Sequence, residues 1–336
     1  MSRSYVGIDV HKKRCVYHEL DTRGNVIRRG RFGNNLAEVS EFGSSLTGQE
    51  AIVVEPVLNY LWLLDQLAGQ VGSIYVATPH KVRVIAEAKC KTDRYDSRIL
   101  AELLRTNFLP ESYIASGAIR ELRLLVRRRY WLVQMVVRMK NRIRYLLFLE
   151  GVDLKVADVS SEKAIREIKR LYISDWIRGT ILELLGIIGE ISPRIRELER
   201  ELEGRSQGIK EIELLRTIPG IGVIWAVTIY AEIGDINRFR SGKAFASYTG
   251  LVPIVRSSGE SIHLGDITRT GSRALRSALV EATPMVIKRS PSLRRLYARV
   301  NYRSNWQKAK VAVARKLAMI IYAMLKNQTP FMAEMA

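Results

Sequence analysis

The sequence predicts a mixed α/β domain at residues 1–115, a helical segment at 116–205 and a mainly α-helical domain at 206–336. Three observations support this prediction. Short apolar runs separated by turn residues fill the first part of the chain, as expected of strands. Beyond residue 118 the apolar residues instead recur at the three- and four-residue spacing of helices. A glycine-rich stretch at 219–271 then precedes another helical tract.

The first domain should contain five strands. Asp21 is followed by Gly24 and Asn25 between the second and third apolar runs, and this pattern is typical of a hairpin turn. The first three runs should therefore form an antiparallel meander. The expected strands are residues 5–10, 15–20, 26–32, 51–54 and 74–77.

Three helices should accompany these strands, at residues 58–71, 79–88 and 93–105. Their alternation with the later strands predicts a layered α/β structure. Thr92 is suited to cap the third helix, because its side-chain oxygen can accept a hydrogen bond from the first turn. Asp93 stands in that turn, where the helix dipole favours a negative charge.

The composition excludes several classes of protein. The chain has 336 residues and a formal net charge of +20, and 47% of its residues are hydrophobic, which is enough for ordinary cores. No apolar run reaches the roughly 18 residues that a membrane span needs, and the first residues lack the apolar core of a secretory signal. With Cys15 and Cys90 as its only cysteines, the chain has no disulfide framework or cysteine-rich zinc site, which indicates a reducing cytosol.

A chain this basic most often binds a polyanion, above all nucleic acid. Residues 206–336 hold 20 Lys and Arg residues against eight Asp and Glu. In the predicted helix at 120–144, nine basic residues accompany a single acid, Glu121, with apolar residues between them. This basic face would attract phosphate, and a merely solvated basic face is the alternative. The nine are Arg120, Arg123, Arg127, Arg128, Arg129, Arg138, Lys140, Arg142 and Arg144.

The last part of the helical segment has the pattern of a short coiled coil. Ile195, Leu198 and Leu202 are three and four residues apart among dense charges of both signs. We therefore expect residues 116–205 to form a linker or a dimerisation arm, with this stripe as a contact between subunits.

Four carboxylates stand near the ends of predicted elements. Asp9 lies in the first apolar strand, where a charge has no obvious packing purpose, and Glu55 follows another such strand. Asp93 and Asp96 are three residues apart, which places both on one helix face about 4.5 Å apart in rise. The order strand-Asp, strand-Glu, helix Asp-x-x-Asp is that of the ribonuclease H and Holliday-junction resolvase architecture.

Convergent carboxylates need a cation, because each pair would repel by about 1 kcal/mol in water and about 4 kcal/mol near a protein surface. Oxygen ligands favour Mg²⁺ or Mn²⁺ over softer metals. Two such ions can hold a phosphodiester, one at the nucleophile and one at the leaving oxygen. Taken singly, Asp9 is also compatible with a turn or cap residue, and Asp93 with a carboxylate that merely stabilises a helix N-terminus.

Short motifs spread from residue 4 to about residue 326 carry a family resemblance. They are residues 7–10 (GIDV), 54–56 (VEP), 91–96 (KTDRYD), 218–222 (IPGIG), 248–253 (YTGLVP), 257–259 (SSG), 267–272 (ITRTGS) and 275–276 (LR). In these motifs and their order, the chain resembles the DEDD transposases of insertion-sequence family one-ten. These are relatives of the Piv DNA invertases and are regarded as bridge-RNA-guided recombinases.

The resemblance implies a RuvC-like catalytic domain of ribonuclease H fold at residues 1–115. It implies that Asp9, Glu55, Asp93 and Asp96 form a tetrad that binds Mg²⁺ or Mn²⁺. It further implies a C-terminal transposase domain with a serine that attacks the scissile phosphate.

Two adjacent serines fit the last expectation. Ser258 directly precedes Gly259 and is our choice, with Ser257 as the alternative. A phosphoserine ester would retain the bond that must later be rejoined, so covalent catalysis suits recombination. From composition alone, either serine is also compatible with a turn residue that makes a local backbone hydrogen bond.

Two further features of the C-terminal domain suit nucleic acid. Residues 218–222 join two apolar helical stretches as in helix-hairpin-helix modules, where glycines let backbone N–H groups approach a phosphate, although a purely structural hairpin is the alternative. Basic residues crowd the last helical tract and would contact the nucleic-acid backbone without reading bases. The expected nucleic-acid contacts are Arg120, Arg123, Arg127, Arg128, Arg138, Lys140, Arg142, Gly220, Gly222, Arg269, Arg273 and Arg276.

The family resemblance implies an RNA-guided DNA recombinase that excises and inserts its own mobile element, and the basic composition is consistent with nucleic acid as its partner. The resemblance implies a structured noncoding RNA that pairs with donor and target DNA while the protein recognises shape and backbone. It also implies a prokaryotic, cytoplasmic, nucleoid-associated homo-oligomer, a dimer or tetramer, whose site combines domains of two subunits. Two rival functions remain, a metal-dependent junction endonuclease that uses water and a nucleic-acid-binding protein without catalysis.

Overall fold

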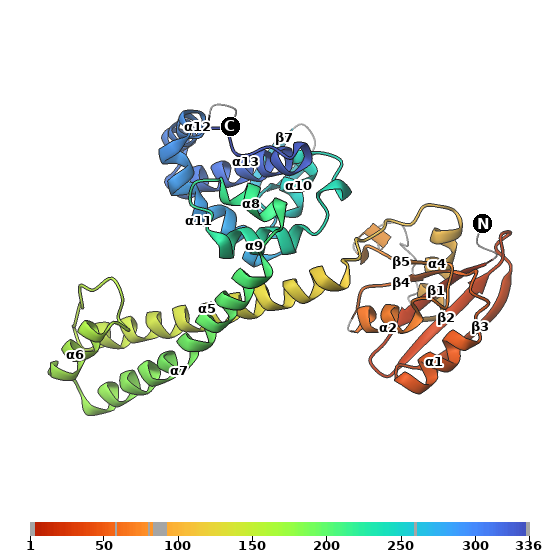
Figure 1. The fold of residues 1–336 in the computed structure, drawn as a ribbon, viewed down its shortest axis with the longest axis horizontal. Helices are drawn as coiled ribbons and strands as arrows, with labels where there is room; N and C mark the ends of the chain where they lie inside the picture. The colour runs from red at the N-terminus through yellow and green to blue at the C-terminus, as the bar shows by residue number, and fades with distance from the viewer. Residues whose placement is uncertain (1–3, 58, 80, 83–92, 259–260, 334–336) are drawn as a thin grey trace. The chain divides into compact units, whose positions relative to one another are not determined.

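Figure 1 shows the fold of the computed structural model. The backbone is described for residues 4–57, 59–79, 81–82, 93–258 and 261–333, and the side chains for all of these except 93–95, 255–258 and 261–264. The chain forms two compact units, Met1–Ile114 and Ala115–Ala336, called here the N-terminal unit and the C-terminal unit. The regions that the sequence separates at residue 205 lie together in the C-terminal unit.

The N-terminal unit is built on a mixed five-stranded sheet with strand order β3-β2-β1-β4-β5. β1 (Tyr5–Val10), β2 (Arg14–Leu20) and β3 (Val26–Gly33) form the predicted antiparallel meander, and β4 (Ala51–Val54) and β5 (Ser73–Val76) run parallel to β1. The predicted hairpin turn is confirmed, because Asp21 Oδ1 accepts hydrogen bonds from the backbone N–H groups of Arg23 and Asn25, both at 2.8 Å.

Helices cover both faces of this sheet (Figure 1). α1 (Leu36–Ser44) and α2 (Tyr60–Leu67) pack on one face, where Phe42 and Leu63 share a core with Ile8. α4 (Asp93–Arg105) packs on the other face, where Leu100 shares a second core with Val53. The mixed α/β class is confirmed. The helix expected at 93–105 has the predicted bounds, α2 is shorter than expected, and the helix expected at 79–88 lies mostly outside the described residues.

Helix α1 is absent from the sequence-based prediction, although its capping signal is readable. Asn35 Oδ1 accepts a hydrogen bond from the Glu38 backbone N–H at 3.1 Å, and Asn35 Nδ2 donates to Glu38 Oε1 at 3.0 Å. This reciprocal pair resembles a capping box, with Asn in the place of Ser or Thr. The Asn-x-x-Glu spacing after β3 was therefore sufficient to predict a helix start.

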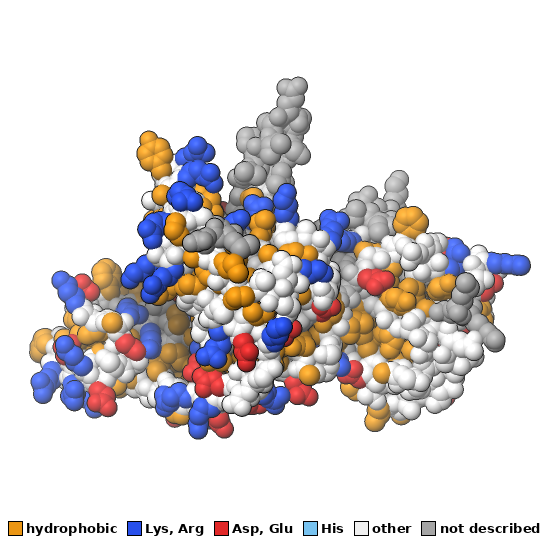
Figure 2. Space-filling view, turned by 45° about the horizontal axis from the view of Figure 1, so that its top comes forward, with side chains coloured by type: hydrophobic (Ala, Val, Ile, Leu, Met, Phe, Trp, Pro, Cys, Tyr) orange, Lys and Arg blue, Asp and Glu red, His pale blue; other side chains and the backbone are white. Residues whose placement is uncertain are grey.

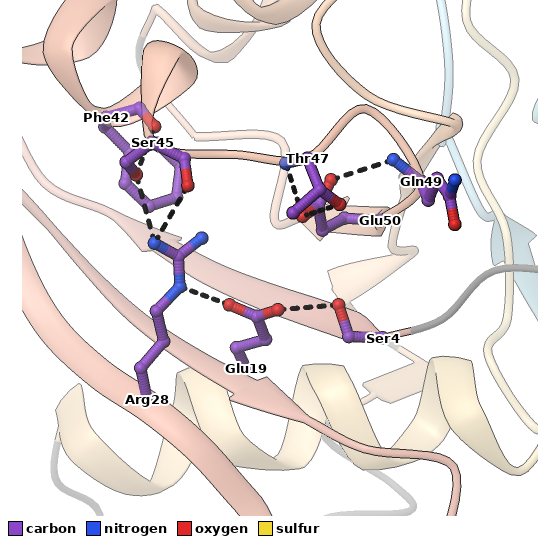
Figure 3. Close-up of polar contacts among 8 residues, drawn as sticks. All are labelled: Ser4, Glu19, Arg28, Phe42, Ser45, Thr47, Gln49 and Glu50. Carbon is purple, nitrogen blue, oxygen red and sulfur yellow. Dashed lines mark hydrogen bonds and ion pairs between the residues drawn. The ribbon is translucent and has the colours of Figure 1, made fainter.

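Two buried carboxylates serve the fold at the end of the sheet where β1 begins (Figure 3). Glu19 of β2 pairs with Arg28 of β3, and Arg28 Nη1 donates to Ser45 Oγ, just after α1, at 3.0 Å. Glu50 accepts hydrogen bonds from the backbone and the side chain of Thr47, both at 2.8 Å. Because buried carboxylates need such partners, Glu19 and Glu50 are structural residues that join strands and turns.

The C-terminal unit begins with two long antiparallel helices, α5 (Gly117–Leu149) and α7 (Asp175–Arg205), which are connected through α6 (Glu162–Arg170). Polar pairs fix their relative direction. Arg205, at the end of α7, pairs with Glu121 near the start of α5 at 3.2 Å. Further along α5, Arg129 Nε donates to Glu199 Oε1 at 3.0 Å, one and a half turns earlier in α7.

The apolar stripe near the end of α7 is covered by the chain's own helices. Leu198 and Leu202 are 5% and 0% exposed, and Ile195 packs against the same core as Leu198. The expectation that this stripe contacts a second subunit is therefore wrong. Its spacing reflects the pairing of α7 with other helices of the same chain, and a coiled coil between subunits is not supported here.

The remainder of the C-terminal unit is mainly helical, as predicted, and surrounds one large core. A two-stranded hairpin, β6–β7, lies in the glycine-rich stretch where no strand was expected. Within the described part of the chain, no helix combines the length and the apolar character needed to cross a bilayer. The elements are α8 (Lys210–Arg216), α9 (Val223–Ile233), a 3₁₀ turn (Ile236–Arg238), α10 (Gly242–Tyr248), β6 (Pro253–Ser258), β7 (Ser261–Ile267), α11 (Arg273–Arg289), α12 (Pro291–Arg303) and α13 (Trp306–Asn327).

Candidate active site

Asp9 lies on the face of β1 that α4 covers. Side chains alternate along a strand, so Gly7 and Asp9 share one face while Ile8 and Val10 share the other. Ile8 and Val10 belong to the core beneath α1 and α2, which leaves Gly7 and Asp9 on the side of α4. Asp9 is only 6% exposed, so its carboxylate is held within the protein near the end of the strand.

Gly7 sets how closely α4 approaches β1. A Cβ atom on Gly7 would lie 2.0 Å from the carbonyl oxygen of Ser97 and 2.5 Å from the backbone nitrogen of Ala101, so only glycine fits between strand and helix. Beside this contact, His18 Nδ1 of β2 lies 2.9 Å from Ser97 Oγ. The helix is thus fixed by a close backbone contact and by a buried polar pair.

The direction of α4 brings its first turn toward Asp9. At the other end of the helix, Arg105 Nη1 donates to the carbonyl oxygen of Thr22 at 3.1 Å. Thr22 lies in the β2–β3 turn, beside the start of β1, so α4 runs from the end of β1 toward its beginning. Asp93, the first residue of α4, and Asp96, which is partly buried, therefore lie at the end of the sheet that carries Asp9.

Glu55 directly follows β4 at the same end of the sheet, where β1 and β4 both end. Val54 of β4 pairs with Ile8 of β1 in parallel register, so Glu55 and Asp9 are the next positions on the two strands. Neighbouring strands lie about 4.8 Å apart. Val53 belongs to the core beneath α4, and the pleat therefore assigns Glu55 to the α4 face as well. The three elements that carry the predicted acids thus converge at one edge.

The donor set at this edge suits a hard divalent cation, because it consists of carboxylate oxygens around the nearly buried Asp9. Among the side chains that are described, no three His, Cys, Asp or Glu residues are grouped closely enough to hold an ion. The side chain of Asp93, the fourth expected ligand, lies outside those described. The complete tetrad stays a prediction.

Sequence reasoning missed His11, which contacts Asp9. His11 Nε2 lies 3.0 Å from Asp9 Oδ2, in the turn between β1 and β2. The signal was its position two residues beyond Asp9, just as the strand ends. At this distance a protonated imidazole attracts the carboxylate as an ion pair.

Cys15 is the neighbour of this group across the β1–β2 hairpin, where it pairs with Val10. Burial, and secondarily the negative charge of Asp9, raise the pKa of the Cys15 thiol to about 12. The thiol is therefore neutral at physiological pH. Because the thiolate is the reactive form, Cys15 is excluded as a nucleophile for this site.

Both candidate serines are strand residues at the end of β6, not turn residues. In the antiparallel register Ser257 pairs with Ile262, and Ser258 pairs with Ser261. The two serines are neighbouring positions of one strand, so exchanging them one at a time tests the choice between them.

The base of this hairpin is locked by two glycines. Gly250 has φ +70°, and a Cβ there would lie 2.2 Å from the Thr270 carbonyl oxygen. Gly271 has φ +75°, and its Cβ would lie 2.4 Å from the Tyr248 carbonyl oxygen. Arg276 of α11 donates to the Thr270 carbonyl oxygen at 2.6 Å. The TRTGS segment at 268–272, which connects β7 and α11, is therefore anchored by close backbone contacts and by Arg276.

Several basic residues expected to contact nucleic acid also hold the C-terminal unit together. Arg127 makes two hydrogen bonds of 2.8 Å to the carboxylate of Glu232, whose side chain is fully buried. Arg123 donates to the Ala231 carbonyl oxygen at 2.6 Å. A third such residue, Lys140, donates to Asp158 at 2.8 Å. With Arg276, these residues have internal partners, and their contact with nucleic acid stays a prediction.

The remaining predicted contacts lie at or near the surface. On the face drawn in Figure 2, Lys and Arg side chains are widely spread, with hydrophobic side chains between them. Arg269 is exposed and lies 3.6 Å from Asp266. Arg120 is partly buried. The other exposed members of the predicted set are Arg128, Arg138, Arg142 and Arg273.

The two glycines of the α8–α9 turn differ in role. Gly220 has φ +86°, and a Cβ there would lie 2.9 Å from Met285 Cβ of α11, so packing explains this glycine. Gly222 precedes α9, and an added Cβ would meet nothing within 4 Å among the described residues. The structural alternative therefore accounts for Gly220, whereas the backbone at Gly222 is open to a ligand.

Two family models match the chain in sequence order. A model described as a DEDD transposase of insertion sequence IS110 matches residues 6–149, which contain all four acids. A model of the transposase IS116/IS110/IS902 family matches residues 212–298, which contain both serines and the TRTGS segment.

Curated relatives extend the similarity. A probable family 20 transposase of Pseudomonas aeruginosa is 24% identical over 98% of both chains. The transposase for insertion sequence element IS1328 of Yersinia enterocolitica is 26% identical over 97% of this chain and 98% of the relative. The pilin gene-inverting protein of Moraxella bovis is 30% identical over 57% of this chain and 59% of the relative.

A Gly7→Ala substitution should destabilise the N-terminal unit by about 1–3 kcal/mol, because the added methyl group forces α4 away from β1. The urea midpoint of unfolding measures this loss. Gly186→Ala is the control, since a Cβ there meets nothing within 4 Å among the described residues and alanine favours a helix. An unchanged midpoint for Gly7→Ala would show that α4 is not in close contact with the strand.

Native Cys15 should resist alkylation by iodoacetamide at pH 8.5 and react once the chain is unfolded in urea. Its pKa is raised from the ordinary 9.0 to about 12, so the native thiol keeps its proton when the unfolded thiol has begun to lose it. For the same reason, this group makes folding less favourable as pH rises from about 9 to about 12. Mass spectrometry of a Cys90→Ser variant reports on Cys15 alone, and rapid native labelling would contradict the assignment.

Proposed function

Because this chain belongs to the IS116/IS110/IS902 family of transposases, we propose that it breaks and rejoins DNA through a serine that becomes esterified to a DNA phosphate. The proposed reaction takes place beside a carboxylate group that binds divalent metal ions. Its biological result is the movement of an insertion sequence between DNA sites.

One observation carries this proposal. Asp9 of β1 and Glu55, which directly follows β4, are neighbours in the parallel register of the two strands. Both lie on the face and at the end of the sheet where α4 begins. Buried acids elsewhere in the unit, Glu19 and Glu50, have structural partners on strands and turns. The acids at the α4 edge instead come from three separate elements, which is the arrangement that a cation-binding group needs.

The serine would act as a covalent nucleophile. Its oxygen forms a bond to phosphorus, the bond from phosphorus to a deoxyribose oxygen breaks, and that oxygen takes up a proton as it leaves. The phosphodiester linkage is exchanged and not hydrolysed, so a DNA hydroxyl can later displace the serine and rejoin the strands without another energy source. Ser258 is the proposed nucleophile and Ser257 the alternative.

Asp9, Glu55, Asp93 and Asp96 would hold the metal ions. Mg²⁺ or Mn²⁺ bound there would promote ionisation of the attacking hydroxyl and stabilise charge on the phosphate oxygens. The chain's own contribution is to position the acids. Gly7 lets α4 pack closely on the sheet, and His11 Nε2 lies 3.0 Å from Asp9 Oδ2, close enough to attract the carboxylate when the imidazole is protonated.

The proposed partners are donor DNA, target DNA and a structured noncoding guide RNA. The support for a guide RNA is the family resemblance, together with a net charge of +20 that suits binding to nucleic-acid backbones. We propose a homo-oligomer, a dimer or tetramer, in which the tetrad of one subunit acts with the serine of another. A location at the nucleoid of a prokaryotic cell would follow from these substrates.

Ser258→Ala should abolish covalent protein–DNA adducts, because no hydroxyl remains to form the ester. The assay incubates the protein with Mg²⁺, candidate guide RNA and labelled donor and target DNA, and detects adducts on denaturing gels. Ser257→Ala, at the neighbouring position of the same strand, is the matched control and should retain adducts. Adducts lost only in Ser257→Ala would move the nucleophile by one residue. DNA nicked without any adduct would favour a water-using endonuclease, and binding without cleavage a non-catalytic protein.

Asp9→Asn and Asp96→Asn should each lower DNA cleavage by about 100-fold or more, since each removes a charge that holds the metal ions. Nucleic-acid affinity should change less than about twofold, because backbone contacts come from basic residues. Gel-based cleavage and fluorescence anisotropy measure the two effects separately. Glu41→Gln, an exposed acid on α1, is the matched control and should leave both unchanged. Equal loss of cleavage and affinity would argue against a metal role.

A further inference from the structure

A cavity of about 560 Å³ lies between α5 and the start of α11, entirely within the C-terminal unit. This volume is within the range of about 300–1,000 Å³ that is common for ligand clefts. The hydroxyl of Tyr130 on α5 lies 3.0 Å from Ser277 Oγ on α11 and ties the two walls together. An adjoining cavity of about 460 Å³ shares Tyr130 and Arg273 with the first, so the two form one extended cleft.

One stripe of α5 forms a wall of this cleft. Arg127, Trp131, Gln134 and Arg138 line the cavity and are spaced by four, three and four residues, which places them on one helix face. The stripe extends over about 16 Å of helix. At this spacing a buried helix would carry apolar residues throughout, so the cationic ends and the amide indicate a surface that faces a polar ligand.

Trp131 is one of three strongly exposed tryptophans among the described residues, with Trp176 and Trp306, and the one that lines this cavity. Its side chain is 56% exposed, although most tryptophans are largely covered in folded proteins. It lies among cations that would keep an apolar protein partner away, with Arg127 one turn before it and Arg138 two turns after it. An exposed indole between guanidinium groups is a common surface for stacking a nucleic-acid base. Such stacking does not depend on the sequence, because every base has a flat aromatic face.

The charge of the cleft is positive and partly fixed in place. No acid lines the larger cavity among the described residues, whereas Arg127, Arg138 and Arg273 do. Arg127 is hydrogen-bonded to the buried carboxylate of Glu232, while more than half of its side chain is exposed. Because the guanidinium is already held in place, it loses less conformational entropy when it binds a ligand. Arg138 and Arg273 are exposed on opposite walls, where they can contact successive phosphates.

We propose that this cleft binds an unpaired nucleotide, with its base stacked on Trp131 and the flanking phosphates on Arg138 and Arg273. A base-paired segment cannot use the site, because its bases are stacked on one another and their faces are covered. The inference rests on the proposed function only in that the chain binds nucleic acid, since it requires no cleavage. The shared chemistry of an unpaired base and phosphate is present in single-stranded RNA and in a displaced DNA strand.

The test measures the affinity of the full-length protein for three labelled probes of one sequence, by fluorescence anisotropy. The probes are single-stranded RNA, single-stranded DNA and duplex DNA. Trp131→Ala should weaken single-strand binding by about 5- to 150-fold, the loss expected for one stacked base. Trp131→Phe should recover most of that loss because it keeps an aromatic face. Trp176→Ala, which removes an exposed indole from α7 outside the cleft, is the matched control and should change nothing.

Arg138→Ala and Arg273→Ala test the phosphate contacts independently. Each should lower the dependence of log affinity on log salt by about 0.7–0.9 for each phosphate that the variant no longer binds. A loss confined to the RNA probe would identify a guide RNA segment as the occupant, and a loss confined to single-stranded DNA would identify a displaced strand. Both results support the site.

The inference is overturned if Trp131→Ala leaves single-strand affinity unchanged, or if it weakens duplex binding equally. It is also overturned if Trp176→Ala has the same effect, because the loss would then not depend on the cleft. Urea midpoints for Trp131→Ala and Trp131→Phe establish that the compared proteins are folded. Failure of the proposed cleavage chemistry would be seen separately, since Ser258→Ala should still bind all three probes normally.

Discussion

The close approach of α4 to β1 at Gly7 is the contact on which the N-terminal unit depends. It permits a helix that starts with Asp93 and Asp96 to lie on the same face of the sheet as Asp9, and the parallel register of β1 and β4 adds Glu55. No side chain at position 7 could be accommodated without moving the helix, because the neighbouring atoms are backbone. The placement of these acidic residues therefore depends on the absence of a side chain at position 7 as much as on the acids themselves.

The C-terminal unit is organised by comparable constraints on the backbone. Gly250 and Gly271 each take a positive φ and contact backbone oxygens, and Arg276 donates to the same segment. These contacts anchor the base of the β6–β7 hairpin, whose first strand carries Ser257 and Ser258. A covalent nucleophile must reach phosphorus in a defined orientation, and a hairpin held at its base suits that requirement better than a free loop.

Much of the fold was predictable because its signals are local. Alternation and turn residues predict the five strands, and α4 has the bounds expected from Thr92 and Asp93. The hairpin β6–β7 was missed because its apolar runs are very short: β6 ends in Arg256 and two serines, and β7 is interrupted by Gly265 and Asp266. Long-range partners were not predictable. Nothing near Arg127 in sequence indicates Glu232, and the stripe at Leu198 and Leu202 has the same spacing whether its partner is another subunit or α5. The location of the acid-bearing elements at one end of the sheet could be predicted from topology, whereas the contact of His11 with Asp9 depends on how a turn closes.

The dual use of arginine determines which substitutions can report on nucleic-acid binding. Removing Arg127 would leave the fully buried carboxylate of Glu232 without its paired cation. Loss of one partner from a buried pair costs roughly 3–5 kcal/mol, and the value here should be smaller because Arg127 itself is more than half exposed. A weakened complex after Arg127→Ala would therefore combine a damaged fold with the removal of a phosphate-binding group. Arg138 and Arg273 extend into the cleft without pairing to a buried acid among the described residues, so their replacement changes the surface charge while the helix packing is retained.

The same reasoning explains why net charge alone is a poor guide to the binding surface. Some of the 54 Lys and Arg residues have partners inside the C-terminal unit, where they hold helices together, and these side chains are less available to a polyanion.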